Sequence, residues 1–346
     1  MNFWVVLWIL SIVMGMKKEK GMSGNVAEGL SYDNTLPLRG ILAVEIVLGH
    51  FYGRVSDCSL IQFNNRAGVL VVGMFLFLSG WGLYESSLRK KNYFKGFLQK
   101  HLCNILLPVY GLYLITVFAF RDSYKLAPQE WIKEILGGHI FSFANWYIWE
   151  LLLLYLVFYL LYKNFDYRLS NAIMIVGMII FIVIGSYMQI GSRWYGSILC
   201  FILGIMCSQN KEQLSIWLSE RIGRTISVSV ILFLASLYIF LKFESLFIVN
   251  AIFTCLSSLL FCITAVVALS CVRIGNVLTC FLGKISYEVF IIHASLMIFW
   301  RNRLAQANDF VYTSVVIVSV IGISYIFNLV MGRRKRVRVP INGNLM

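Results

Sequence analysis

Long uninterrupted apolar runs constrain this chain more than any other feature of its sequence. The stretches from Ala172 to Tyr187 and from Leu246 to Ser270 contain no charged residue. A helix that spans a bilayer needs about 20 consecutive apolar residues. Apolar residues make up 59% of the chain and charged residues 13%, whereas soluble domains contain about 45–50% and about 25%. The sequence therefore predicts a polytopic integral membrane protein and excludes a soluble globular domain.

Ten apolar runs are candidate membrane spans. Barrel strands would be short and alternating, so the predicted fold class is all-α, with about ten transmembrane helices. We divide the chain into an N-terminal apolar and basic segment (1–36), a transmembrane domain (37–332) and a basic tail (333–346). The predicted spans are 37–56, 67–87, 102–120, 143–161, 170–190, 194–209, 225–241, 246–271, 282–300 and 311–332.

The net charge of +14 is distributed as expected for a membrane protein. The N-terminal stretch, the even-numbered connections and the tail hold 20 of the 30 Lys and Arg residues, and the odd-numbered connections hold 9. Basic residues accumulate on the cytoplasmic side, so both termini are predicted to be cytoplasmic and the tail to lie beside anionic lipid. No nucleic-acid partner is needed to explain the charge.

The first 36 residues contain a further apolar run, residues 3–15. At 13 residues it is short for a span, and it lacks the positive n-region of a signal peptide. We expect an interfacial or partly inserted helix. The alternative is that translation begins at Met16 or Met22.

Known sequence motifs for metals, disulfides and nucleotides do not occur. Seven of the eight cysteines lie in or beside predicted spans, and no CxxC or Cys/His spacing is present. The sequence predicts no metal site. The GxxxxGK[ST] and GxGxxG motifs are also missing, which disfavours NTP-driven pumping and Rossmann cofactors.

Ionisable side chains at membrane depth are costly and mark functional paths. Predicted spans five, seven, eight and ten contain none, so we expect them to be scaffold. The remaining candidates fall in the first, fourth, sixth and ninth spans: Arg39, Glu45, His50, Glu150, Arg193, Glu288 and His293.

Arg39 and His50 are 11 residues apart in the first span. That separation is three helical turns plus about 20°, so both side chains project from one face, about 16 Å apart along the axis. We expect this face to line a corridor, with Arg39 near the inner surface. Glu45 lies about 140° from His50 around the helix, so it is a weaker candidate. Arg39 as a snorkelling side chain and His50 as an interhelical hydrogen bond are the alternatives.

The ninth span carries a stripe of its own. Ser286, Phe290, His293 and Met297 recur at the spacing of one helical face. Two intramembrane histidines on different helices indicate a functional site. His293 alone is equally compatible with a role in joining helices.

The second connection is basic, with Tyr93 and Phe94 interleaved. Lys and Arg bind phosphate, and aromatic rings stack on purines, so this connection is a candidate nucleotide-binding site. The alternative is the cytoplasmic bias of basic residues alone. Its basic residues are Arg89, Lys90, Lys91, Lys95 and Lys100.

Six segments, in order, resemble the motifs of one family. They are LPLRGILAVEIVLGHF (36–51), GVLVVGMFLFLSGWGL (68–83), KGFLQKHLCNILLPVY (95–110), NWYIWELLLLY (145–155), RWYGSILCFILG (193–204) and LGKISYEVFIIH (282–293). Together they resemble the acyltransferase family 3 membrane proteins, whose opening signature is R-x10-H. The resemblance covers about residues 36–300. It departs from the family pattern at His101 and Asn104, where the family has arginines, and at Phe290, where it has a tyrosine.

The resemblance implies an enzyme that moves an acyl group, most often acetyl, from cytoplasmic acetyl-CoA to a hydroxyl of a surface polysaccharide or a lipid-linked sugar precursor. The membrane would be a bacterial-type inner membrane. Arg39 and the basic second connection would hold the donor's phosphates, with Lys95 or Lys100 replacing the missing arginines. His50 would be the general base or would form an acyl-histidine. Candidate oxyanion donors are Ser79, Asn145, Tyr147 and Ser286.

Two further functions stay open at this point. The same polar path suits a transporter or flippase that moves a glycan or acyl carrier without chemistry. The other alternative to the acyltransferase is a non-catalytic membrane sensor or scaffold. The sequence leaves the acceptor, the acyl group, the face of transfer and the oligomeric state undetermined.

Overall fold

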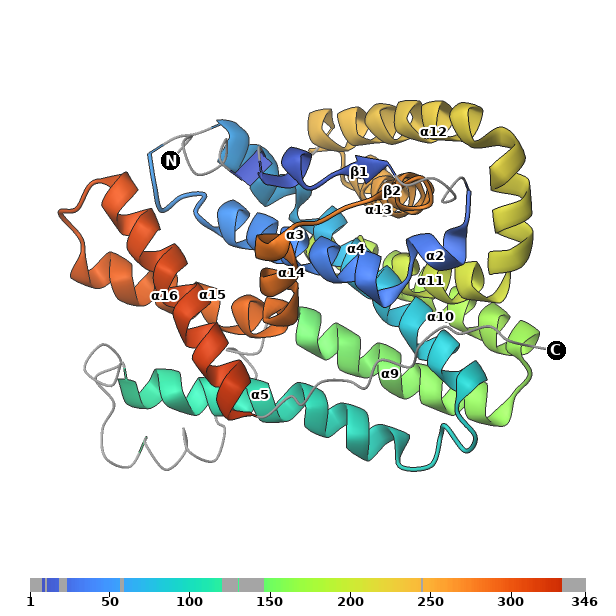
Figure 1. Cartoon of the computed structure of the whole chain (residues 1–346), viewed down its shortest axis with the longest axis horizontal. Helices are drawn as coiled ribbons and strands as arrows, with labels where there is room; N and C mark the ends of the chain where they lie inside the picture. The colour runs from blue at the N-terminus through green and yellow to red at the C-terminus, as the bar shows by residue number, and fades with distance from the viewer. Residues whose placement is uncertain are drawn as a thin grey trace.

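The structure is a computed structural model that describes residues 8–9, 11–18, 24–56, 59–119, 130, 146–243 and 245–331. Helices form nearly all of it, which confirms the predicted all-α class (Figure 1). The elements, in chain order, are β1 (Lys17–Lys18), α2 (Val26–Gly29), α3 (Tyr32–His50), α4 (Ser59–Arg89), α5 (Phe97–Ala119), α9 (Trp146–Asn164), α10 (Tyr167–Tyr187), η1 (Ser192–Trp194), α11 (Leu199–Gln209), α12 (Lys211–Lys242), α13 (Phe247–Leu269), β2 (Val272–Arg273), α14 (Val277–Lys284), α15 (Ser286–Arg303) and α16 (Asp309–Val330).

Six of these helices are long and apolar enough to cross a membrane: α4, α9, α10, α12, α13 and α16. The bent pair α14 and α15 makes a seventh if it is counted as one span. Helix α11 has 11 residues and rises about 16 Å, which is too short to cross a hydrocarbon core of about 30 Å alone. Ten spans and two cytoplasmic termini therefore stay predictions.

Three predicted spans have a different form in the structure. The predicted span 194–209 is the short helix η1 followed by α11. The predicted span 282–300 covers the end of α14 and most of α15, which meet at 77°. The predicted span 225–241 belongs to α12, which starts earlier and kinks at Arg221, where the backbone leaves the helical region (φ −131°, ψ 19°). Figure 1 shows α12 turning between its two arms.

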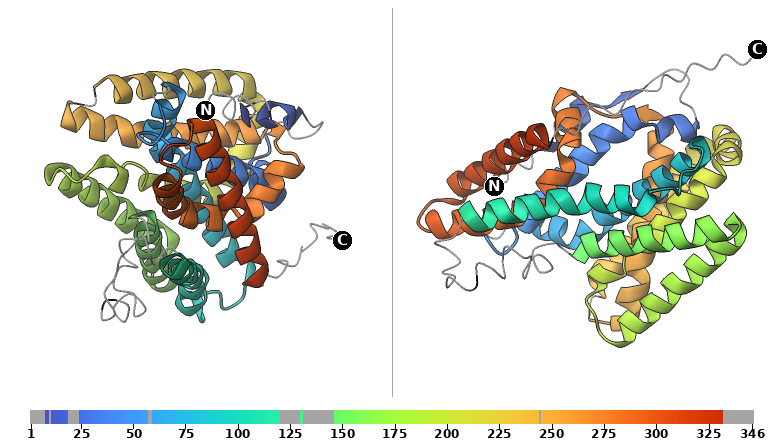
Figure 2. Two further views of the ribbon diagram at one scale, coloured as in Figure 1. Left: turned by 90° about the vertical axis from the view of Figure 1, so that its left-hand side faces the viewer. Right: turned by 90° about the horizontal axis from the view of Figure 1, so that it is seen from below.

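The helices differ in how much of their apolar surface the protein itself covers. In the most apolar stretch of each helix, 67% of the residues of α4 are buried, whereas only 22% of the residues of α10 and of α12 are buried. Helix α4 therefore lies in the centre of the bundle, and α10 and α12 lie at its edge, where their bare apolar faces suit contact with lipid (Figures 1 and 2).

Glycines bring two pairs of central helices into backbone contact. An added Cβ at any of four glycines would lie between 2.0 and 2.2 Å from a carbonyl oxygen of the facing helix. All four glycines belong to the family-like segments. Small residues at such positions let helices pack closely in membranes, so these motifs set the distance between helix axes. The contacts are Gly40 with Thr279 and Gly283 with Leu36 between α3 and α14, and Gly80 with Phe201 and Gly204 with Phe77 between α4 and α11.

The described part of the N-terminal apolar run packs against the bundle. Trp8 is buried, and its Nε1 donates a hydrogen bond to Glu45 of α3 at 3.1 Å. Asn276, the N-cap of α14, donates to the Ser11 carbonyl oxygen at 2.9 Å. Strand β1 then pairs antiparallel with β2. The run that we expected at the interface is thus attached to both α3 and α14.

Candidate active site

Two histidines from different helices meet inside the bundle. His50 is the last residue of α3, and His293 lies in the middle of α15. Their ring centroids are 4.8 Å apart, with the ring planes at 74°. His293 is fully buried and His50 is half-buried. The close packing of α3 on α14 and α15 therefore joins the two histidines that the sequence analysis singled out separately.

Hydrogen bonds to the backbone fix which nitrogen of each ring is available. Nδ1 of His50 lies 2.8 Å from the Ile46 carbonyl oxygen, and Nδ1 of His293 lies 3.1 Å from that of Val289. A carbonyl oxygen only accepts, so in each neutral ring Nδ1 carries the hydrogen and Nε2 carries the lone pair. Within the described residues, Nε2 of His293 is buried with no hydrogen-bond partner. The site thus holds two Nε2 atoms able to accept a proton.

Aromatic contacts connect the histidines to two hydroxyl groups. The Phe290 ring lies 6.0 Å from that of His293 and 5.0 Å from that of Tyr147 on α9. The buried Tyr147 side chain hydrogen-bonds with Ser79 of α4, and Ser79 donates to the Phe75 carbonyl oxygen. Of the predicted oxyanion donors, Tyr147 and Ser79 therefore lie together, one ring away from His293.

The other two predicted oxyanion donors differ. The buried Ser286 hydroxyl donates to the Gly283 carbonyl oxygen at 3.0 Å, at the bend between α14 and α15. Its hydrogen is therefore used to hold the bend. Asn145 lies outside the described residues.

Arg39 lies near the opposite end of α3 from His50. Its side chain is half-buried, and its guanidinium carbon is 5.8 Å from the centroid of the Tyr32 ring. Between Arg39 and His50 on the same face, Ala43 and Ile46 are buried. The shared face is thus turned into the protein and away from lipid, while an open corridor along it stays a prediction.

Glu45 has structural partners. Its carboxylate accepts hydrogen bonds from Trp8 at 3.1 Å and from the Asn64 side-chain amide at 2.8 Å. This explains how an acid is accommodated between Arg39 and His50 without pointing along their face. The sequence had placed Glu45 off that face, but it gave no signal for either donor.

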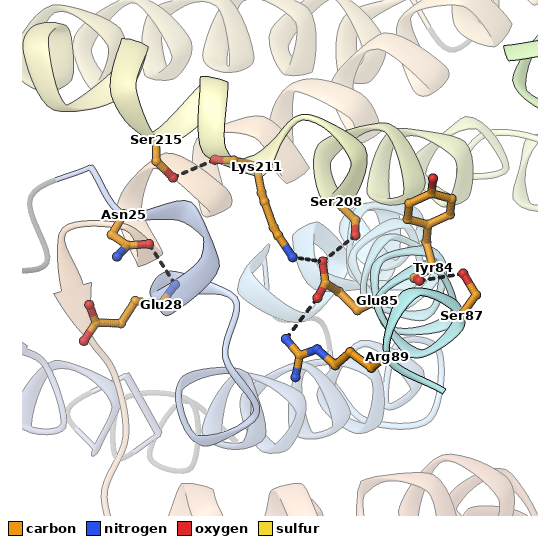
Figure 3. Close-up of polar contacts among 9 residues, drawn as sticks. All are labelled: Asn25, Glu28, Tyr84, Glu85, Ser87, Arg89, Ser208, Lys211 and Ser215. Atoms are coloured by element: carbon orange, nitrogen blue, oxygen red, sulfur yellow. Dashed lines mark hydrogen bonds and ion pairs between the residues drawn. The ribbon is translucent and has the colours of Figure 1, made fainter. Parts of the chain in front are cut away.

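A second polar cluster surrounds Glu85, near the end of α4 (Figure 3). The buried Glu85 carboxylate accepts from Lys211 at 2.5 Å, from Ser208 at 2.7 Å and from Arg89 at 3.0 Å. Sequence reasoning missed this cluster, although an acid within the second predicted span was a usable signal. Arg89, predicted to bind the donor, thus forms an ion pair with Glu85 while its side chain stays 71% exposed. The other predicted donor-binding residues are exposed: Lys90, Lys91, Lys95 and Lys100.

The aromatic residues of the same connection pack against their neighbours. The rings of Tyr93 and Phe94 lie 5.4 and 6.1 Å from that of Phe97, which stacks on Tyr159 at 5.7 Å. His101, at a family arginine position, lies 4.3 Å from Phe97. Burial raises the pKa of the Tyr93 phenol further above its ordinary value. Stacking of a purine on these rings stays a prediction.

The fold and the histidine pair define a helical membrane protein that holds two imidazole rings in contact inside its bundle. The acyltransferase 3 family model, described as an acyltransferase domain, matches residues 38–329. The chain belongs to this family, and acyl transfer is the class of reaction that the family supports. No curated protein and no solved structure matches the chain. The matched region contains both histidines, while Trp8 and the N-terminal run precede it.

Proposed function

We propose that the protein transfers an acyl group, in the simplest case acetyl, from cytoplasmic acetyl-CoA to a hydroxyl group of a cell-surface polysaccharide or a lipid-linked sugar precursor. The membrane is a bacterial-type inner membrane. The observation that carries the proposal is the contact of His50 with His293, each with its Nε2 lone pair available. Family membership supports the reaction class.

His50 acts as the general base in this proposal. Its Nε2 takes the proton of the acceptor hydroxyl as that oxygen attacks the thioester carbonyl carbon. The tetrahedral intermediate collapses, the carbon–sulfur bond breaks, and the protonated His50 returns the proton to the sulfur of CoA. An acyl-His50 intermediate is the alternative route. Tyr147 is the predicted oxyanion donor best placed for this role, because its ring lies one ring away from His293, whereas the Ser79 hydroxyl donates to the Phe75 carbonyl oxygen.

The donor enters from the end of α3 that carries Arg39. Arg39 and the exposed basic residues of the connection between α4 and α5 provide cations for its phosphates. This connection has the side chains to attract an anionic carrier even though its aromatic rings pack against one another.

The test uses full-length protein in lipid nanodiscs, radiolabelled acetyl-CoA and envelope glycan from the producing cells. Because general base catalysis contributes about 10²- to 10⁴-fold, His50→Ala and His50→Gln are expected to lower acetyl transfer by that range. The matched control is Ser229→Ala, which removes a buried hydroxyl that bonds to Ile226 within α12. It is expected to keep full activity.

Normal acetyl transfer by correctly inserted His50→Ala protein contradicts the role of His50. Movement of a glycan or an intact thioester across liposomes, with no release of CoA, contradicts the enzymatic proposal and favours a transporter.

A further inference from the structure

Two arginines lie near the end of α3 that carries His50, the end opposite Arg39. Nη1 of Arg54 donates to the carbonyl oxygen of His50 at 2.7 Å. Arg301, in the last turn of α15, has its guanidinium carbon 5.3 Å from the ring centroid of Tyr312. Tyr312 in turn packs edge to face against Phe51, the neighbour of His50, at 5.9 Å. Both cations therefore border the same end of α3.

The charge of Arg54 reaches the reacting groups. Arg54 is half-buried, and it lies close enough for its charge to act on both His50 and His293. The charges of Arg54 and Arg301 both act on the buried Tyr312. The two arginines thus share Tyr312 as a neighbour, and Arg54 brings positive charge to the histidines.

No acid among the described residues forms an ion pair with either arginine. Asp309 is the acid whose charge interacts with that of Arg301, and it already accepts hydrogen bonds from the Ser56 amide, at 2.8 Å, and from the Ser56 hydroxyl. A guanidinium has five N–H donors, and Arg54 uses one of its five on His50. Its remaining donors are available for a ligand.

We infer that Arg54 and Arg301 bind an anionic group, a carboxylate or a phosphate, on the saccharide that accepts the acyl group. This inference rests on the proposed function and names its acceptor class. Guanidinium groups pair with carboxylate and phosphate oxygens through parallel hydrogen bonds. The bond to the His50 carbonyl oxygen holds the Arg54 head next to the general base. An anion bound there places a neighbouring hydroxyl of the same saccharide at His50.

An arginine that follows a helix often bonds to the last carbonyl groups. That role fits each arginine at its own helix end, since Arg301 lies in the last turn of α15, but it does not explain why the two helix ends bring both charges to one residue, Tyr312. The two arginines together are what indicates an anionic ligand.

The first experiment identifies the acceptor by mass spectrometry of envelope glycans from cells with and without the protein. Acetyl on a unit that carries a carboxylate or a phosphate supports the inference, and the fragment masses distinguish these two sources. Acetyl on a neutral unit overturns it. Absence of any acetyl difference overturns the proposed function itself, and the inference with it.

The second experiment measures acetyl transfer to that glycan by Arg54→Gln, Arg54→Lys and Arg301→Gln in nanodiscs. Because a charge-assisted pair is about twice as strong as a neutral one, each glutamine variant is expected to raise the KM for the glycan about tenfold, with the KM for acetyl-CoA unchanged. Arg54→Lys is expected to recover part of this loss. Arg301→Gln matters most, because Arg301 does not contact His50.

The matched control is Arg303→Gln, whose guanidinium carbon lies 4.6 Å from the Phe299 ring centroid. It is expected to leave the KM for the glycan unchanged. An equal effect of Arg303→Gln, or a change confined to kcat, overturns the inference. So does an effect that depends on anionic lipid in the nanodisc and not on the glycan, because the arginines then bind headgroups.

Discussion

The Glu85 cluster and the histidine pair use their hydrogen bonds in opposite ways. Around Glu85, three side chains donate to one carboxylate, so the cluster satisfies itself and ties α4 to α11 and α12. At the histidine pair, the backbone occupies each Nδ1 and leaves each Nε2 available, and that of His293 is buried without a partner among the residues that the structure describes. Buried polar groups normally find partners. The comparison indicates that the satisfied cluster stabilises the fold, and the proposed function assigns the unsatisfied one to the substrate.

The strongest test of this division is His293→Asn. Asparagine has a similar size but no basic nitrogen, so kcat for acetyl transfer is expected to fall about 100-fold, the lower end of the range for general base catalysis. The KM for acetyl-CoA and the Tm are expected to stay unchanged. Initial rates and thermal unfolding in the same nanodiscs check this. A lower Tm with full activity per folded molecule would assign His293 to the structure instead.

Glu85→Ala tests the other cluster. It leaves Ser208 and the largely buried Lys211 without their partner, so the free energy of unfolding is expected to fall by about 1–3 kcal/mol, while kcat per folded molecule stays constant. The matched control, Glu212→Ala, removes an exposed acid from the same helix as Lys211 and is expected to change neither quantity. A loss of kcat in a stable Glu85→Ala protein would show that the Glu85 cluster takes part in catalysis, which contradicts the comparison.

Trp8→Phe tests whether the contact of the N-terminal run with α3 stabilises the fold. The substitution removes the donor to Glu45 while Asn64 keeps its own bond. Loss of one hydrogen bond is expected to lower the free energy of unfolding by about 0.5–1.5 kcal/mol. Trp217→Phe, at a half-exposed tryptophan of α12, is the control and is expected to have no effect. Equal Tm values for the two variants would show that the bond from Trp8 to Glu45 does not stabilise the protein.

Arg89→Gln has the smallest expected effect. It tests whether Arg89 only pairs with Glu85 or also binds a phosphate of the acyl donor. An exposed ion pair contributes well under about 1 kcal/mol, so the Tm should hardly change. If its exposed side chain also contacts a donor phosphate, the KM for acetyl-CoA rises about two- to threefold. An unchanged KM assigns Arg89 to the Glu85 cluster alone.

The sequence predicted the helical class and most of the helices, because uncharged runs leave few alternatives to a membrane helix. It did not predict the bend at Ile285 or the shortness of α11. The bend follows no proline. It is stabilised by the bond from the Ser286 hydroxyl to the Gly283 carbonyl oxygen, which does not change the apolar pattern.

For the candidate site, helical spacing identified His50 and His293 as separate candidates. Their contact was not predictable from either helix, because it depends on how α3 and α14 pack across a long stretch of chain. Arg54 was missed for a related reason. Its basic charge is common near span ends, and only its bond to the His50 carbonyl oxygen distinguishes it.

The backbone contact between α3 and α14 has a consequence for how the protein responds to its lipid. Gly40 and Gly283 lock the two helices together without intervening side chains, and α15 follows α14 after one residue. Thinner or thicker bilayers make helices tilt, and helices joined in this way tilt as one body. Catalytic rate should therefore be nearly constant across lipids of different chain length, even where the peripheral helices α10 and α12 change their inclination.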